Sequence, residues 1–369
     1  MAYDYEYGVD SIVGFTRNQL ITAIELFLDY DSTWTVLQNI SISAGSGDAP
    51  ASSDYSILQK TNGTVDEDVY ISLWLGSSVN GNPTIAMNTS TGYTPGANWY
   101  AQPGARVGAG TDGTSPNVIY TRCSHVTDKI VEYHLFGYPG HFYCVFKTDQ
   151  GYWRNFGFGH IDKLSDFVGS GFSCASFSMN SITNIDDADS NGAIQFFDSY
   201  VGSGGEQDLR HCSQLRYDEI SNALRYGVTG HENYTYEKNI GLYQPNGGWL
   251  YSGNMTSTRQ ASVDGGYVCP FEYDKMQRAP TTFSLTSPLI PIYVYFSTDF
   301  SNKYKALIGR LPHIFGMNIK SLAETQEITI QGETYMVFPV SKKSSSMNDG
   351  TNTLNSYYFG FCTLKKIEA

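Results

Sequence analysis

The residues of this 369-residue chain best suited to binding a metal lie in a short acidic loop. Their spacing follows the calcium-loop pattern D-x-[DN]-x-[DN]-G, in which oxygens from one tight turn surround the ion. Gly192 provides the turn at the sixth position. The residues expected to bind calcium are Asp187, Asp189, Asn191, Ala193 (through its carbonyl) and Asp198. The same residues also suit a plain surface turn. We expect no required cofactor, and calcium is the one ion that the sequence suggests.

A second group of metal-ligand types is less specific. His134 and His141 flank a short turn, and Cys144 and His160 follow nearby in the sequence. Imidazole and thiolate bind transition metals, but these spacings match no established motif, so structural histidines are expected. The six cysteines are scattered, with no CxxC pair, which favours small buried thiols over zinc or a disulfide framework.

Catalytic motifs are absent from the sequence, and we expect that the protein is not an enzyme. It has no G-x-S-x-G, no P-loop and no dinucleotide fingerprint. A glycosidase pair stays open, because the separation of two carboxylates depends on the fold; the candidates are Asp162, Asp166, Glu206 and Asp208. Some aromatic residues could stack on sugars or pack in a core or a subunit contact: Trp99, Trp153, Trp249 and Tyr251.

Composition narrows the class of partner. With 36 acidic and 23 basic residues the net charge is −13, and no basic cluster exists, which argues against binding nucleic acid. Charged residues make up only 16%, whereas the chain has 28 Tyr and 37 Gly, a mixture typical of β-strands, tight turns and semi-polar interfaces. The acidic start lacks an apolar core and no apolar run approaches the ~20 residues of a membrane helix, so neither a secretory signal nor membrane insertion is expected.

Periodicity predicts a mainly β protein with sandwich- or barrel-like antiparallel sheets, one N-terminal helix and long inter-strand loops. Thr16 and Gln19 form a capping-box pair ahead of an apolar helical run over 20–28. Short alternating segments start at Trp34 and resume at 129–135, 141–147 and 172–177. We expect residues 1–112 to form the helix and a β subdomain, and 113–369 a central and C-terminal β domain.

The remaining segments yield more specific expectations. Residues 92–117 form a long loop, 213–226 a short helix, and 227–287 an irregular insertion. Pro291 marks a bulge or edge in the strand over 289–296. A hairpin over 328–338 turns at Gln331-Gly332, and a last strand covers 357–364.

Several segments together resemble the virion structural proteins of tailed bacteriophages. They are Asn98–Gly104, Gly151–Gly159, Leu307–Gly316, Glu327–Ile330 and Gly332–Val340. In such proteins a Gly-x-Leu/Ile-Pro-Gly-type turn leads to a short hairpin, and here His313 takes the position where Gly is frequent. The resemblance covers scattered parts of most of the chain, and it brings no catalytic residues.

The resemblance implies a structural subunit of a phage particle, in the tail, neck or baseplate, that assembles in the host cytoplasm and remains in the virion. Its partners would be further copies of itself and other virion proteins. One alternative is a receptor- or carbohydrate-binding fibre or adaptor module, and another is a polysaccharide-degrading enzyme. The sequence leaves open the position in the particle, the oligomer number and the presence of inter-subunit disulfides.

Overall fold

The computed structural model describes a large part of the chain. The described residues are 4–30, 34–40, 55–60, 69–77, 83–90, 92–98, 102–103, 107–108, 117–118, 121–122, 129–149, 151, 153–163, 172–176, 213–219, 222–228, 249–252, 264–268, 289–297, 305–319, 321–339 and 359–367. Among them, no helix is both long enough and apolar enough to cross a membrane.

Three antiparallel strands form the centre of the molecule: β9 (Ile130–Tyr138), β10 (His141–Thr148) and β11 (Trp153–His160). Almost every side chain in them is buried, because both faces of this part of the sheet are covered. Side chains alternate between the faces. Leu135, Phe142 and Phe156 pack in one core, whereas Phe136, Tyr143 and Trp153 pack in the other.

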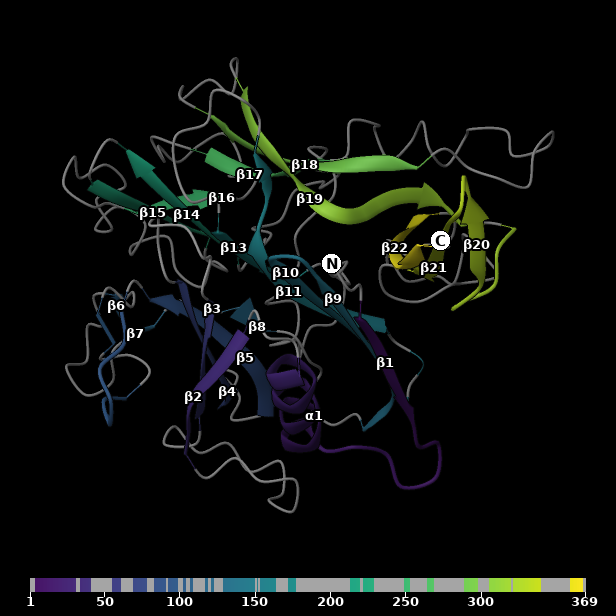
Figure 1. The fold of residues 1–369 in the computed structure, drawn as a ribbon, viewed down its shortest axis with the longest axis horizontal. Helices are drawn as coiled ribbons and strands as arrows, with labels where there is room; N and C mark the ends of the chain where they lie inside the picture. Colours follow the sequence, from purple (N-terminus) through teal and green to yellow (C-terminus); the bar gives the residue numbers. More distant parts are fainter. Residues whose placement is uncertain are drawn as a thin grey trace, which may run out of the picture.

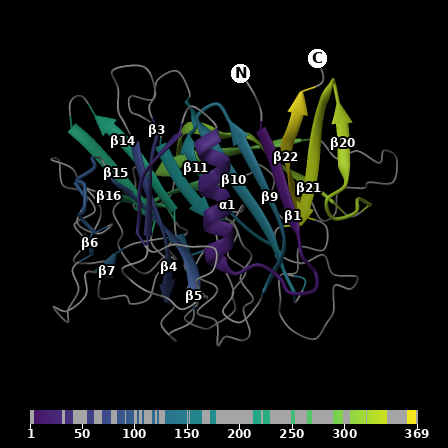
Figure 2. The same ribbon diagram turned by 60° about the horizontal axis from the view of Figure 1, so that its bottom comes forward.

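The first face is covered by helix α1 (Arg17–Tyr30) and by a separate antiparallel sheet (Figures 1 and 2). That sheet has the order β2 (Trp34–Ile40), β3 (Tyr55–Lys60), β4 (Val69–Ser77), β5 (Pro83–Ser90) and β8 (Thr121–Arg122). Leu20, Ile21 and Ile24 of α1 are fully buried here, and each contributes about 1.5–3 kcal/mol by leaving water.

The predicted capping box starts α1. The Thr16 N–H donates to Gln19 Oε1 at 2.7 Å, and the Gln19 N–H donates to Thr16 Oγ1 at 3.1 Å. Two backbone donors that a helix start leaves unpaired are thereby satisfied. The prediction of this helix and of its start is confirmed.

The second face is covered by C-terminal strands: β19 (Lys305–Asn318), β20 (Glu327–Ile330), β21 (Glu333–Pro339) and β22 (Phe359–Ile367). They lie side by side in the order β19-β22-β21-β20 (Figure 1). At the other end of the same large sheet, β1 (Asp4–Val9) pairs with β9, so the start of the chain joins its centre.

The remaining strands complete the sheets. Between β11 and β19 lie β13 (Phe172–Ser176), β14 (Ser213–Glu219), β15 (Asn222–Val228), β16 (Trp249–Ser252), β17 (Asp264–Val268) and β18 (Ile290–Ser297). Short pairs involve β6 (Val107–Gly108) with β7 (Asn117–Val118), and β12 (Asp162–Lys163) with β19. The prediction of a mainly β fold with antiparallel sheets and one helix is confirmed; among the described strands, the only parallel pairs are those of β16 with β15 and with β17.

The predicted helix over 213–226 is wrong, because this segment forms the antiparallel hairpin β14–β15. Its apolar residues also recur at every second position, as in Leu215 and Tyr217, so the pattern suits a strand equally well. Backbone pairing with β13 decides between the two. The segment 227–287, predicted to be irregular, contains the strands β16 and β17.

Two predictions about the C-terminal part are confirmed. The hairpin β20–β21 turns at Gln331 and Gly332, which have φ of 54° and 83°, the pair of left-handed residues expected of a type I′ turn. At Pro291 the register between β18 and β19 shifts, which is a bulge. The division at residue 112 stays a prediction.

The turn predicted around His313 is instead a bend within the long strand β19. His313 has a φ of 58°, a left-handed conformation that favours glycine. On one edge β19 pairs with β12 before this residue and with β22 after it, whereas β18 pairs with the other edge on both sides of it. The requirement for left-handed backbone therefore exists at this position, but it serves a bend and not a turn.

Candidate functional site

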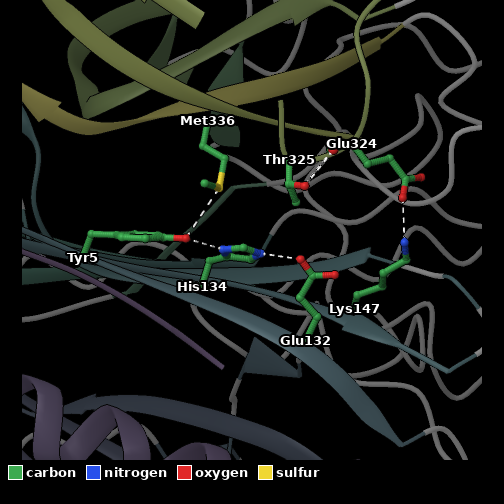
Figure 3. A network of polar contacts seen from close by, with 7 residues as sticks. All are labelled: Tyr5, Glu132, His134, Lys147, Glu324, Thr325 and Met336. Carbon is green, nitrogen blue, oxygen red and sulfur yellow. Dashed lines mark hydrogen bonds and ion pairs between the residues drawn. The ribbon is translucent and has the colours of Figure 1, made fainter. Parts of the chain in front are cut away.

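The first candidate site is a hydrogen-bonded chain between the start of the molecule and its C-terminal hairpin (Figure 3). His134 of β9 lies between two partners, with Nδ1 at 2.8 Å from the Tyr5 hydroxyl and Nε2 at 2.9 Å from Glu132 Oε1. The same hydroxyl lies 3.9 Å from Met336 Sδ in β21. We call Tyr5, Glu132, His134 and Met336 the polar seam.

Strand geometry explains why these residues meet. Glu132 and His134 are two positions apart in β9, so both point to the face that the C-terminal strands cover. In the pairing of β1 with β9, Tyr7 lies opposite His134 and Tyr5 opposite Phe136, which sets the Tyr5 ring beside the imidazole. The seam thus joins three strands that are distant in sequence.

The electrostatics of the polar seam keep Glu132 ionised and the Tyr5 hydroxyl neutral. The hydrogen bond from His134 is the largest of the effects that lower the pKa of Glu132, so this carboxylate stays ionised. Burial, with the nearby Glu327 carboxylate, raises the pKa of Tyr5 well above its ordinary value. A phenol with a raised pKa is a neutral hydrogen-bond donor, not an activated nucleophile.

Aromatic rings enclose His134 and limit its contact with water. The side chain is almost completely buried. Rings whose centroids lie between 5.2 and 6.5 Å from the imidazole belong to Tyr5, Tyr7, Phe136, Trp153 and Phe338. In this apolar surrounding the hydrogen bonds of the seam are stronger than they would be in water.

Two ion pairs flank the seam. Lys147 Nζ lies 2.7 Å from Glu324 Oε2 and 5.1 Å from the centre of the Trp153 ring. Lys365 Nζ lies 2.7 Å from Glu327 Oε1 and 4.3 Å from the centre of the Tyr5 ring. Both ammonium groups therefore combine a carboxylate with an aromatic face. Lys147 links β10 to the segment before β20, and Lys365 links β22 to β20 and to the Tyr5 ring of β1.

The second candidate site is an exposed apolar segment on the free edge of the large sheet. In the part of the chain that the structure describes, β1 makes backbone pairs only with β9, and β22 lies beside it without pairing (Figure 2). The exposed fractions are 61% for Tyr7, 59% for Val9, 90% for Ile12 and 66% for Val13. We call these four residues the apolar edge. An open strand edge with apolar side chains is a template for association.

The loop that carries Ile12 and Val13 is held in a defined shape. Asp10 Oδ1 accepts hydrogen bonds from the Ile12 N–H at 3.1 Å and from the Val13 N–H at 2.9 Å. These bonds lower the pKa of the Asp10 carboxyl. Backbone bonds from Asp10 to Val131 and from Phe15 to Ile130 attach both ends of the loop to β9. The two apolar side chains are thus presented by an ordered loop.

The predicted calcium loop (Asp187, Asp189, Asn191, Ala193, Asp198) lies outside the described residues, as do Trp99, Asp166, Glu206 and Asp208. Within the described part no group of three or more His, Cys, Asp or Glu side chains could hold a metal. His134 and Cys144 point to opposite faces of the sheet, because Val145 and not Cys144 lies opposite His134. The structure therefore does not bring this candidate metal set together.

Other predicted residues have structural positions. Trp153 is fully buried, so it belongs to the core and is not available to stack on a sugar. Cys144 and Cys362 are buried free thiols whose pKa is raised by burial, as expected of small core residues. Asp162, one of the glycosidase candidates, accepts a hydrogen bond from Arg310 Nε at 3.0 Å.

Sequence reasoning missed the polar seam. The alternation of Glu132 and His134 in a strand could have shown that they share a face. No local signal links them to Tyr5, which is 129 positions from His134. The apolar edge was also missed, although Ile12-Val13 before a capping box is visible in the sequence.

The sequence matches no protein-family model and none of the curated proteins. The chemistry of the polar seam and of the apolar edge is thus what bears on function.

Proposed function

We propose that the protein is a structural subunit of a bacteriophage particle, in its tail, neck or baseplate, and that it acts by self-association and by docking to other virion proteins. The observation that carries the proposal is the apolar edge, an open strand with exposed apolar side chains at the end of a large sheet. Exposed apolar side chains at an unpaired strand favour association, and the carboxylate of Glu6 is the one exposed charged side chain of β1.

The occupant that we propose for this edge is a second copy of the same chain. A second copy could pair its own strand with the unpaired backbone N–H and C=O groups of β1 and cover Tyr7 and Val9. Ile12 and Val13 would then contact the same second copy. Large interfaces between identical subunits are common and apolar at their centres. The phage assignment is supported by the resemblance of the segments that form β11, β19, β20 and β21.

Self-association can be tested with charge substitutions at the loop. We expect the purified protein to form rings or sheets, visible by negative-stain electron microscopy and sedimentation velocity. The double variant Ile12→Asp, Val13→Asp should shift it toward monomers, because two carboxylates would be desolvated in the contact. Both side chains are exposed, so the fold should be kept, and an unchanged melting temperature would check this.

Leu26 provides a matched control. It is 69% exposed on α1 and lies outside the apolar edge, so Leu26→Asp should leave assembly unchanged. If the wild-type protein is strictly monomeric and absent from virions, or if both variants weaken assembly equally, the proposal fails.

Calcium is a secondary part of the proposal, with a structural role at Asp187, Asp189, Asn191, Ala193 and Asp198. Calcium at a hundredfold excess over its dissociation constant should add about 2.7 kcal/mol of stability. Asp187→Ala should remove the resulting rise in melting temperature. The same melting temperature with calcium and with a chelator would leave this loop as a surface turn.

A further inference from the structure

The polar seam has one feature that a simple buried hydrogen bond lacks. The Tyr5 hydroxyl carries a single proton but has two acceptors within reach, His134 Nδ1 at 2.8 Å and Met336 Sδ at 3.9 Å. It can donate to only one of them at a time. Which one it uses depends on whether His134 Nδ1 carries a proton.

Two complete arrangements follow from this geometry. With a neutral imidazole, Nε2–H donates to Glu132 and Tyr5 O–H donates to Nδ1. With an imidazolium, Nε2–H still donates to Glu132, Nδ1–H donates to the Tyr5 oxygen, and Tyr5 O–H turns to Met336 Sδ. In both arrangements the two ring N–H or N positions of His134 and the Tyr5 hydroxyl each keep a hydrogen-bond partner, so neither state leaves a buried donor of the polar seam unpaired.

The surrounding charges also accommodate the proton. Three carboxylates of the seam and its flanks, Glu132, Glu324 and Glu327, stand against two ammonium groups, Lys147 and Lys365. This set lacks one positive charge until His134 is protonated. Among the described residues, two further titratable groups lie near this set.

Those two groups are Tyr7 of β1 and Glu333 of β21. Tyr7 stacks on the imidazole with the ring centroids 6.3 Å apart and contributes no positive charge. Glu333 accepts a hydrogen bond from Tyr335, and both lie on the face of β21 opposite to Met336. Neither group opposes the proton on His134.

We infer that the polar seam is a proton-tolerant latch, in which the Tyr5 hydroxyl turns from His134 to Met336 when His134 is protonated, so that β1 stays fastened to β9 and β21 in both states. The thioether of Met336 serves as the second acceptor. Because Tyr7 and Val9 lie on β1 and the loop with Ile12 and Val13 follows it, the latch would keep the apolar edge presented whether or not His134 is protonated; this consequence alone rests on the proposed function.

The variant Met336→Leu tests the latch, because it nearly keeps the volume of the side chain and replaces the thioether acceptor with a branched hydrocarbon. At about pH 8 we expect the melting temperatures of this variant and of the wild-type protein to differ only by a small packing effect. At about pH 5 we expect the difference between the two proteins to grow by roughly 2 °C or more, with the variant less stable. An equal change at both pH values would overturn the proposal.

A second variant isolates the hydroxyl. Tyr5→Phe should lower the melting temperature at both pH values, because His134 Nδ1 then loses its partner in either state. Met336→Leu added to Tyr5→Phe should have no pH-dependent effect; if it retains one, the sulfur does not act through the hydroxyl. Nitrogen-15 NMR of His134 provides a measurement independent of stability. At about pH 8 we expect the Nε2–H tautomer, and the Nδ1–H tautomer would contradict the latch.

Discussion

The ring of Tyr133 lies directly against Gly8 in the neighbouring strand. The two residues are opposite each other in the pairing of β9 with β1, and a Cβ on Gly8 would come within 2.5 Å of the ring. The same ring meets Phe15 edge to face, with the centroids 5.1 Å apart. The absence of a side chain at Gly8 therefore lets Tyr133 fill the space between β1 and the start of α1.

Gly8→Ala should lower the free energy of unfolding by about 1–3 kcal/mol, because the methyl group overlaps a packed aromatic ring. Urea unfolding followed by circular dichroism measures the change. In a Tyr133→Leu background the ring is gone, so the same substitution should cost much less. An equal cost in both backgrounds would show that the strain comes from the backbone and not from Tyr133.

The capping box yields a second prediction. Thr16→Ala removes the acceptor of the Gln19 N–H and should destabilise the protein by about 1 kcal/mol. Thr16→Ser keeps the hydroxyl and should retain most of the stability. Thermal unfolding of the three proteins distinguishes the cap from the loss of a methyl group, which both variants share.

Patterns that act over a few residues were predictable from the sequence. The capping box at Thr16 and Gln19, the turn at Gln331-Gly332 and the bulge at Pro291 each depend on neighbours in the chain, and all three occur. The burial of β9 and β10 also followed from their aromatic alternation. These features are predictable because the partner groups are near in sequence, so local chemistry selects the structure.

Features that depend on long-range pairing were not predictable. The apolar spacing over 213–226 suits a helix or a strand, and the pairing with β13 makes it a strand. The bend at His313 lies where one edge of β19 passes from β12 to β22, which no local pattern indicates. Tyr5 meets His134 only because β1 and β9 pair, so the polar seam could not be read from either segment alone.

The hairpin turn offers a stabilising substitution. Gln331 adopts a φ of 54°, a left-handed conformation in which a long side chain is strained and which Asn tolerates better. Gln331→Asn should therefore raise the free energy of unfolding by about 0.5–1 kcal/mol. Gly332→Ala, which adds a Cβ where φ is 83°, should lower it. If Gln331→Asn were neutral or destabilising, an interaction of the Gln331 side chain would have to outweigh its backbone strain.

The Glu132 carboxylate makes the stability of the fold depend on acid pH. Its pKa is lowered, chiefly by the hydrogen bond from His134. Because the folded-state pKa lies below the unfolded-state value, the carboxylate stabilises the fold above the unfolded-state pKa. That contribution is lost as the pH falls through the folded-state pKa, where the carboxylate takes up its proton.

Glu132→Gln keeps an oxygen that can accept the His134 N–H but removes the titration. The free energy of unfolding of this variant should therefore fall less steeply than that of the wild-type protein between about pH 5 and about pH 3, measured by urea unfolding at each pH. Glu6→Gln, on the exposed face of β1, is the control for losing one surface carboxylate. If the free energy of unfolding of Glu132→Gln fell with pH as steeply as that of the wild-type protein, other carboxylates, and not the polar seam, would cause the acid sensitivity.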